Sequence, residues 1–252
     1  MILSTNTFAE AADAPPLAIA HGLFGSARNW GVIAKRLAAE RPVITLDMRN
    51  HAGSGWADAH SYEDLAGDLH DTLAHLPGPI DVLGHSMGGK AAMVLALTQP
   101  HLVRRLIVAD IAPVAYSHDQ HGPITAMRNV KLAQVEKRQD AADQMKGIED
   151  DLKPFLLQSL DLKEKRWRLN LDVLAREMDK ITGFPAITGQ FPGPTLFLSG
   201  AQSDYVLPAH RDKIRSHFPQ ARFAKIPGAG HWLHAEKPRE FETAVQVFLN
   251  AD

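Results

Sequence analysis

The segment of residues 81–90, DVLGHSMGGK, constrains the fold more than any other part of this sequence. The apolar residues that open it predict a buried strand, its glycines predict a tight turn, and the residues that follow, AAMVLALT, predict an apolar helix. A strand, a tight turn and a helix in this order form half of the unit from which parallel sheets are built. The turn itself matches two motifs with different chemistry.

The first motif is the phosphate-binding loop, G-x-x-x-x-G-K-[ST]. Gly84, Gly89 and Lys90 fit this pattern, and Asp110, after the run LIVA, imitates the acid that positions Mg²⁺. Position 91 is alanine, however, so the hydroxyl group that should bind Mg²⁺ is absent. We therefore reject this interpretation.

The second motif is G-x-S-x-G, in which a strained turn lifts a nucleophilic serine above the edge of a sheet. Ser86 occupies the serine position, and Gly84 and Gly88 are the small neighbours that such a turn needs. The predicted strand before the turn and the predicted helix after it are the context in which this motif works. An ordinary glycine-rich turn with an unreactive serine is the alternative without chemistry.

Short apolar runs alternate with helical segments along most of the chain. The predicted strands cover residues 17–20, 42–46, 80–83, 106–109, 195–198 and 222–226, and their apolar character indicates strands that are covered on both faces. A helix is predicted for residues 62–76, with Ser61 and Asp64 as its capping pair. We expect an α/β fold with a mostly parallel central sheet that is flanked by helices.

Residues 116–190 interrupt this alternation. They contain no convincing strand and many charged helix formers, for example in NVKLAQVEKRQDAADQMK. We therefore predict a core of residues 1–115 and 191–252, with residues 116–190 inserted as a helical cap, or lid. In an open parallel sheet, ligands bind beyond the carboxyl ends of the strands, so the residues directly after each strand are the candidates for chemistry.

Composition excludes several classes of partner. A formal net charge of -2, from 27 basic and 29 acidic residues, provides no field that would attract nucleic acid or an anionic membrane. Because the chain has no cysteine, it has no disulfide, no thiolate metal site and no cysteine nucleophile. No apolar stretch approaches the 18 residues or so of a membrane-spanning helix, and the start has no leader pattern. We expect a soluble, cytoplasmic protein, and the sequence does not indicate its oligomeric state.

A serine nucleophile needs a general base that accepts its proton near neutral pH, and histidine is the side chain suited to this. Of the 13 histidines, His231 lies in the glycine-rich run PGAGH, after the last predicted strand and before the final helix. The glycines allow its ring to turn back over the edge of the sheet. We predict that His231 is the base and that His234 and His85 are packing residues.

The reaction also needs backbone N–H groups that stabilise the oxyanion of a tetrahedral intermediate. In a G-x-S-x-G turn, one of them is the N–H of the residue after the serine, here Met87. The other is expected from the loop after the first motif-bearing strand, where IAHGLFGSARNW turns sharply at His21 and Gly22. We predict the N–H of Leu23 as this donor, with Phe24 as an additional candidate.

Five segments, HGLFGSARNW, DMRNHAGSG, GHSMGGKAAM, ADIAPVAY and GAGHWLHAEKP, together resemble the alpha/beta-hydrolase superfamily, and they are most similar to small bacterial carboxylesterases of the YbfF type. The resemblance implies the alpha/beta-hydrolase fold and acyl transfer to water through an acyl-enzyme, with no cofactor and no metal. The implied substrate is a small-molecule ester or thioester. Because the nucleophile is Ser86 and not aspartate, the resemblance points away from haloalkane dehalogenases and epoxide hydrolases.

The acid that orients His231 has two candidates. Across the superfamily this acid usually follows the strand after the lid, at a spacing of G-x-x-D, but Ser203 stands at that spacing from Gly200 and Asp204 comes one residue late. Asp110 ends the strand after the Ser86 turn, and DIAPV matches the YbfF-type pattern in which the acid comes from this earlier strand. We predict Asp110 as the third catalytic residue, with Asp204 as the alternative.

Two functions from other classes stay open. A cofactor-free perhydrolase or haloperoxidase, or a hydrolase of carbon–carbon bonds, could use the same serine, histidine and acid. A non-catalytic binding module on the same fold would have no need of these three residues together.

Overall fold

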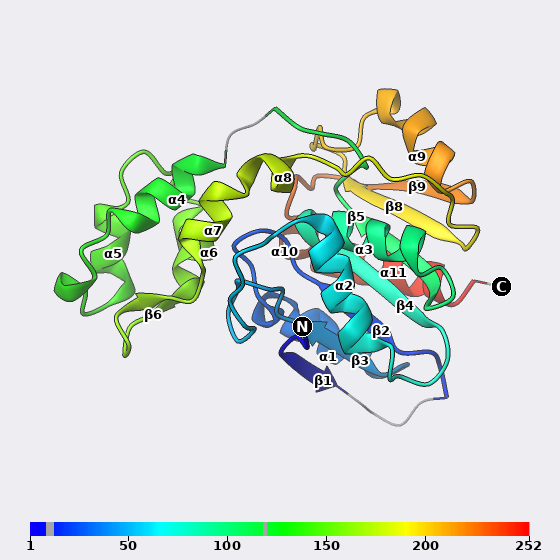
Figure 1. Cartoon of the computed structure of the whole chain (residues 1–252), viewed down its shortest axis with the longest axis horizontal. Coiled ribbons are helices and arrows are strands. Elements are labelled where there is room, and N and C mark those ends of the chain that lie inside the picture. The colour runs from blue at the N-terminus through cyan, green and yellow to red at the C-terminus, as the bar shows by residue number, and fades with distance from the viewer. Residues whose placement is uncertain (9–12, 118–119, 252) are drawn as a thin grey trace.

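A seven-stranded sheet forms the centre of the protein in its computed structural model, which describes residues 1–8, 13–117 and 120–251 (Figure 1). The strand order is β1-β3-β2-β4-β5-β8-β9. β1 pairs antiparallel with β3, and all other neighbours pair parallel, so the predicted mostly parallel sheet is confirmed. The strands are β1 (Thr5–Phe8), β2 (Leu17–Ala20), β3 (Val43–Leu46), β4 (Ile80–His85), β5 (Val103–Ala109), β8 (Thr195–Gly200) and β9 (Ala221–Ile226).

All six predicted strands are present, and their ends differ from the prediction by at most three residues. β1 was not predicted because it is an exposed edge strand without an apolar run. The prediction that β9 is covered on both faces is wrong, since only its first and last residues are buried. β9 lies at the other edge of the sheet, where one side of a strand faces solvent.

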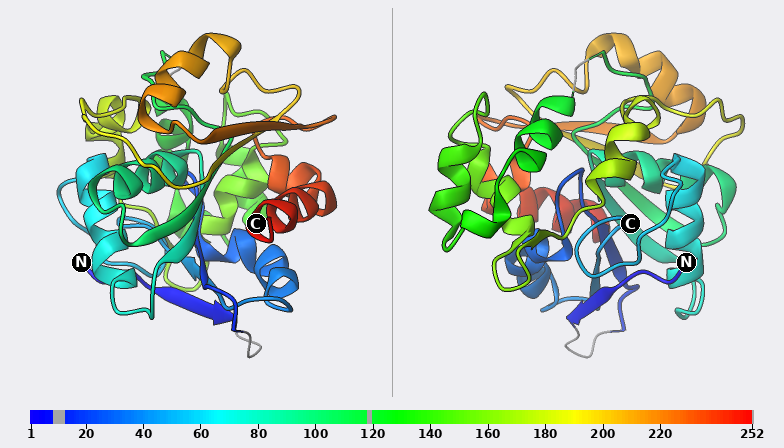
Figure 2. Two further views of the ribbon diagram at one scale, coloured as in Figure 1. Left: turned by 90° about the vertical axis from the view of Figure 1, so that its right-hand side faces the viewer. Right: turned by 60° about the vertical axis from the view of Figure 1, so that its left-hand side comes forward.

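Helices cover both faces of the sheet, as the two views in Figure 2 show. Side chains of successive strand residues alternate between two apolar clusters, so that Val82 packs in one and Leu83 in the other. On the side of Val82 lie α2 (Tyr62–Leu73), α3 (Met87–Thr98) and α9 (Arg211–His217). On the side of Leu83 lie α1 (Gly31–Leu37), α10 (Leu233–Glu236) and α11 (Pro238–Leu249).

The predicted capping pair opens α2. The Asp64 N–H donates to the Ser61 hydroxyl at 3.2 Å, and the Ser61 N–H donates to the Asp64 carboxylate at 3.1 Å. The helix ends at Leu73, three residues before the predicted end, and the chain turns at Gly78, whose φ of 71° suits glycine.

The elements between β5 and β8 lie to one side of the sheet (Figure 1). Most are helices, but the sequence interpretation missed a short antiparallel pair, β6 (Leu160–Asp161) with β7 (Arg166–Trp167), which is too short for a recognisable alternation. We propose to regard residues 116–190 as a cap. Its helices are α4 (His121–Arg128), α5 (Arg138–Gln144), α6 (Lys153–Leu156), α7 (Leu171–Arg176) and α8 (Met178–Thr182). Within the described residues, the 3₁₀ helices are Ala27–Trp30, Leu132–Gln134, Leu157–Ser159 and Pro208–His210.

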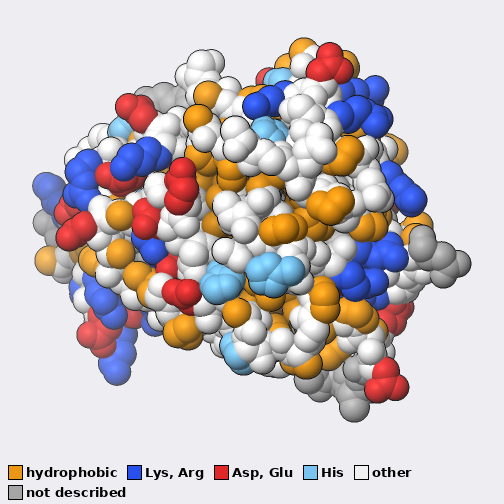
Figure 3. All heavy atoms as spheres, turned by 45° about the vertical axis from the view of Figure 1, so that its right-hand side comes forward, with side chains coloured by type: hydrophobic (Ala, Val, Ile, Leu, Met, Phe, Trp, Pro, Cys, Tyr) orange, Lys and Arg blue, Asp and Glu red, His pale blue; other side chains and the backbone are white. Residues whose placement is uncertain are grey.

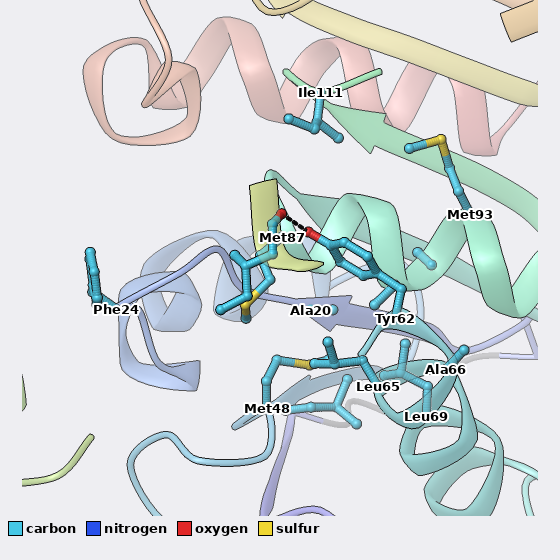
Figure 4. Packing of buried hydrophobic residues seen from close by; sticks show 14 of the residues in the cluster. Ala20, Phe24, Met48, Tyr62, Leu65, Ala66, Leu69, Met87, Met93 and Ile111 are labelled. Atoms are coloured by element: carbon cyan, nitrogen blue, oxygen red, sulfur yellow. Dashed lines mark hydrogen bonds between the residues drawn. The ribbon is translucent and has the colours of Figure 1, made fainter. Parts of the chain in front are cut away.

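Lys90 of α3, the lysine of the rejected phosphate-binding motif, connects the core to the end of α8. Its ammonium group is buried and donates hydrogen bonds to the backbone carbonyls of Thr182, at 2.8 Å, and Gly183. The rings of Tyr116 and Tyr62 lie 4.8 and 5.5 Å from the ammonium nitrogen. Figure 4 shows Tyr62 and the hydrogen bond from its hydroxyl group, which the carbonyl of the neighbouring Ile181 accepts. These contacts give Lys90 a structural role, in which it joins α3 of the core to the end of α8.

Burial lowers the pKa of Lys90 to about 7. Because the folded-state pKa lies below the unfolded value of about 10.4, the unfolded chain binds this proton more tightly, and Lys90 makes stability rise with pH between about 7 and 10. Relative to Lys90→Met, we expect the free energy of unfolding of the wild type to increase by about 2–3 kcal/mol from pH 7 to pH 9.5. Urea unfolding at both pH values measures this difference.

Lys213→Met serves as the control, since Lys213 is exposed on α9 and should leave the pH dependence of the wild type unchanged. Parallel pH curves for the wild type and Lys90→Met would contradict the assignment of a depressed pKa to Lys90.

Candidate active site

The turn that carries Ser86 is strained, and its glycines are required by close contacts. Ser86 has φ 51° and ψ −118°, a conformation that residues with a Cβ atom rarely adopt. A Cβ atom on Gly84 would lie 2.2 Å from the carbonyl oxygen of Gly88, and one on Gly88 would lie 2.4 Å from that of Ala20. β4 and α3 hold the two ends of the turn, so the serine hydroxyl stands above the carboxyl edge of the sheet.

Three predicted site residues from separate parts of the chain lie in one hydrogen-bonded line. His231 Nε2 lies 3.1 Å from Ser86 Oγ, and His231 Nδ1 lies 2.8 Å from Asp110 Oδ2. Because an ionised carboxylate only accepts hydrogen bonds, Nδ1 carries the proton and Nε2 is free to accept one from the serine. The arrangement supports transfer of a proton from Ser86 to His231.

Asp110 is fully buried at the end of β5, with φ 53°. Besides His231, its carboxylate accepts a hydrogen bond from the N–H of Gly200 at 3.1 Å and one from the hydroxyl of Ser203 at 2.5 Å. Gly200 and Ser203 reach Asp110 because β8, which ends at Gly200, is the neighbour of β5 in the sheet. Asp204 is exposed, and within the described part of the chain no hydrogen bond joins its carboxylate to His231.

Ser203 is the site residue that sequence reasoning did not assign. The signal for it was the G-x-x-D spacing, which placed Ser203 where an acid is usual. In the structure, this position holds a hydroxyl group that donates to an acid on the neighbouring strand. Ser203 therefore supports the acid that follows β5 and does not replace it.

The backbone N–H groups of Leu23 and Met87 have no acceptor among the residues that the structure describes, and both residues line the cavity beside Ser86. Phe24 does not qualify as a further donor, because its N–H donates to His51 Nε2 at 3.2 Å. A Cβ atom on Gly22 would lie 3.2 Å from the Cβ of Ser86, so glycine allows this loop to approach the serine closely.

His85 and His234 pack behind His231. His85 Nε2–H donates to the backbone carbonyl of His231 at 2.9 Å, and His234 stacks on Trp30 at 4.2 Å between ring centroids. Burial lowers the pKa of His85 and lowers the pKa of His234 to about 3, so neither ring adds positive charge beside His231 at neutral pH. On the other side, the Tyr205 ring stacks on His231 at 4.1 Å. The imidazole is thus held in one plane by its neighbours.

Ser86 opens into a cavity of about 320 Å³. Residues of the core and of the cap line it together, and most of them are apolar or aromatic. The apolar lining includes Leu23, Phe24, Tyr62, Met87, Ile111, Tyr116, Leu152, Phe155, Ile181, Tyr205 and Trp232. Such a cavity suits an uncharged or apolar group next to the serine hydroxyl.

The described residues contain no cluster of histidine and acidic side chains that could hold a metal ion. Within the same residues, no helix is long and apolar enough to cross a membrane. On the face in Figure 3, acidic and basic side chains both occur, with hydrophobic side chains between them. This mixture agrees with the small net charge of the chain.

Comparison with known proteins gives consistent matches over nearly the whole chain. The model of the alpha/beta hydrolase family matches residues 17–244. Esterase YbfF of Escherichia coli is 40% identical over 94% of this chain and 93% of its own length. The mouse sn-1-specific diacylglycerol lipase ABHD11 is 42% identical over 98% of this chain and 85% of its own length. The solved structure of a marine microorganism esterase covers 98% of this chain and 99% of its own, with a TM-score of 0.91 and 35% identity.

Proposed function

The chain belongs to the alpha/beta hydrolase family, and on this basis we propose that it is a serine hydrolase that cleaves small-molecule esters or thioesters through an acyl-enzyme. The observation that carries this proposal is the hydrogen-bonded line from Ser86 through His231 to Asp110, whose Ser86 end opens into an apolar cavity. The names of the relatives, an esterase and a diacylglycerol lipase, support ester bonds as the target.

In the proposed reaction, Ser86 Oγ attacks the carbonyl carbon of the substrate while His231 Nε2 accepts the serine proton. The N–H groups of Leu23 and Met87 stabilise the oxyanion that forms. Asp110 stabilises the resulting imidazolium and keeps its Nδ1 proton in place. His231 then returns the proton to the leaving alcohol or thiol, and the acyl group stays on Ser86.

A water molecule completes the cycle. His231 removes a proton from it, the hydroxide attacks the acyl-enzyme, and the carboxylic acid leaves as Ser86 regains its proton. The hydrogen bonds from Gly200 and Ser203 keep the Asp110 carboxylate aimed at His231 in both halves of the reaction. No step in this sequence needs a metal ion or a cofactor.

The proposal predicts hydrolysis of p-nitrophenyl esters with a preference that depends on acyl length, because the cavity next to Ser86 is apolar and finite. A series from acetate to dodecanoate, beside acyl-coenzyme A thioesters of the same lengths, measures the preference. We expect EDTA and added Mg²⁺ or ATP to leave the rates unchanged. Absence of turnover on every ester and thioester would contradict the proposed function, and strong inhibition by EDTA would contradict the metal-free mechanism.

The same experiment separates the alternatives. If the protein oxidises a halide or forms a peracid, and if this turnover requires hydrogen peroxide, the protein is a perhydrolase or haloperoxidase. Cleavage of a diketone without cleavage of any ester would indicate a carbon–carbon bond hydrolase.

A further inference from the structure

Residues 48–52, which we call the bridging segment, pair with the cap on one side. The N–H of Ala52 donates to the carbonyl of Arg168 at 2.7 Å, and the N–H of Asn170 donates to the carbonyl of Asn50 at 3.0 Å. Between these two hydrogen bonds, His51 and Leu169 form an isolated antiparallel bridge. Three consecutive residues of the core thus follow the backbone of three consecutive residues of the cap.

On its other side, the bridging segment holds the loop of residues 21–25, which we call the oxyanion loop. His51 Nε2 accepts the hydrogen bond from the Phe24 N–H at 3.2 Å, and His21 Nε2 accepts one from the Met48 N–H at 2.9 Å. The two rings lie 5.1 Å apart, and both are buried. Phe24, Met48 and Met87 belong to one hydrophobic cluster, part of which Figure 4 shows.

The hydrogen bonds of the two rings define their tautomers. His51 Nδ1 lies 2.8 Å from the carbonyl of Arg49, and His21 Nδ1 lies 2.8 Å from the carbonyl of Gly22, so both Nδ1 atoms carry a proton. Each Nε2 is then free to accept. Burial lowers the pKa of His51 to about 3 and that of His21 to about 4, so both rings stay neutral when the enzyme works near pH 7.

These contacts set the direction of the Leu23 N–H from both sides. The carbonyl of Gly22 and the N–H of Leu23 belong to one planar peptide unit and point in opposite directions. That carbonyl accepts hydrogen bonds from His21 Nδ1 and from the Gly25 N–H, at 2.8 and 3.0 Å. The next peptide unit is held by His51 through Phe24, which has a positive φ of 63° and would not keep this conformation without support.

We propose that His51 is a positioning residue for the oxyanion loop and that it couples this loop to the cap. The inference rests on the proposed function, because it concerns the donor that stabilises the oxyanion. When residues 168–170 lie against the bridging segment, His51 holds the Phe24 N–H, and the Leu23 N–H faces the site. When the cap moves away, this support is withdrawn, and the oxyanion loses one of its two donors.

Two substitutions at position 51 separate the roles of its two ring nitrogens. His51→Gln places an amide oxygen near the position of Nε2 and keeps the acceptor for the Phe24 N–H. His51→Asn places its amide near the position of Nδ1 and loses that acceptor. We expect His51→Asn to lower kcat on p-nitrophenyl butyrate by about 10- to 100-fold, with KM changed less than about threefold, and His51→Gln to stay within about fivefold of the wild type.

The affinity for a trifluoromethyl ketone is the second measurement. Such a ketone forms a hemiketal with the serine and presents an oxyanion to the same donors, so its Ki should rise by the factor by which kcat/KM falls. A general loss of stability would reduce the fraction of active enzyme, which titration with a fluorophosphonate corrects, and would leave Ki unchanged. His217→Asn is the matched control, because this buried histidine of α9 also has Nδ1 beside a backbone carbonyl, that of Gly189, and lies outside the cavity.

The link to the cap is tested from the cap side. Asn170 caps α7 by accepting the Val173 N–H, and its side chain also donates to Asn50 Oδ1 at 3.1 Å. Asn170→Asp keeps the helix cap and removes the donor. As a single substitution, Asn170→Asp is expected to lower kcat and weaken ketone binding by about three- to tenfold. Added to His51→Asn, it should have little further effect, because the coupling through His51 is already absent there.

An inactive wild type would contradict the proposed function itself. If the wild type is active, equal Ki and kcat in His51→Asn and the wild type, or equal losses in His51→Asn and His51→Gln, would overturn the role of His51. Full additivity of the two substitutions would overturn the coupling to the cap. Should His51→Asn fail to fold, an unchanged ketone affinity in Asn170→Asp overturns the proposal by itself.

Discussion

Ser86→Ala is expected to reduce ester hydrolysis by about three to six orders of magnitude while the protein still folds. The substitution removes the oxygen that attacks the substrate, but it keeps the Cβ atom and leaves the N–H groups of Leu23 and Met87 in place. Binding and oxyanion stabilisation therefore persist and leave a residual rate above that of water. Initial rates on p-nitrophenyl acetate and labelling by a fluorophosphonate measure the loss.

Ser216→Ala is a suitable control for this experiment. Ser216 is an exposed serine of α9 that binds the carbonyl of Lys213, and its loss should leave the rate unchanged. Ordinary turnover by Ser86→Ala, after contaminating esterases are excluded, would show that another residue is the nucleophile.

The second large effect is expected at Asp110. In Asp110→Asn, the new amide group can donate a hydrogen bond to His231 Nδ1, and this favours the tautomer whose ring proton is on Nε2. A protonated Nε2 can no longer accept the proton of Ser86. We expect kcat to fall by about four orders of magnitude with little change in KM. Asp204→Asn should keep nearly normal turnover, because Asp204 is exposed and does not contact His231.

Measurement of kcat for both variants on one ester, with circular dichroism to establish folding, decides between the two acids. A large loss in Asp204→Asn beside normal turnover in Asp110→Asn would reverse the assignment. Moderate and similar losses in both would mean that the two carboxylates share the role.

The fold was largely predictable because its signals are local. Short segments of four or five residues, most of them apolar and followed by a turn rich in Gly, Asp or His, marked six strands, and Ser61 with Asp64 marked the start of α2. The family prediction is confirmed by the match to residues 17–244. The elements that were missed are β1 and the β6–β7 pair. β1 is an exposed edge strand without an apolar run, and β6 and β7 have two residues each, too few for an alternation of apolar and polar residues to be recognised.

The role of Lys90 shows the limit of a motif. Its place after two glycines imitates a phosphate-binding lysine, and the missing hydroxyl at position 91 was enough to reject that function. Its partners, the carbonyls of Thr182 and Gly183, are about 90 residues away in the chain, and nothing in the sequence near either end indicates the contact. The same holds for His51 and Phe24, which are 27 residues apart.

By itself, the sequence determined the strand, turn and helix around Ser86, because the close contact of Gly84 with Gly88 arises within a few residues of the serine. Gly88 is required instead by a tertiary contact, the approach of Ala20 on the neighbouring strand β2. It also restricted the base to a histidine in a flexible loop and the acid to Asp110 or Asp204. Sequence reasoning favoured Asp110, and only the tertiary structure brings its carboxylate to within 2.8 Å of His231 Nδ1, which supports this proposal. The sheet places the end of β5 beside the end of β8, so Asp110 receives the N–H of Gly200 and the hydroxyl of Ser203, whereas one residue of displacement along the chain turns Asp204 out into solvent.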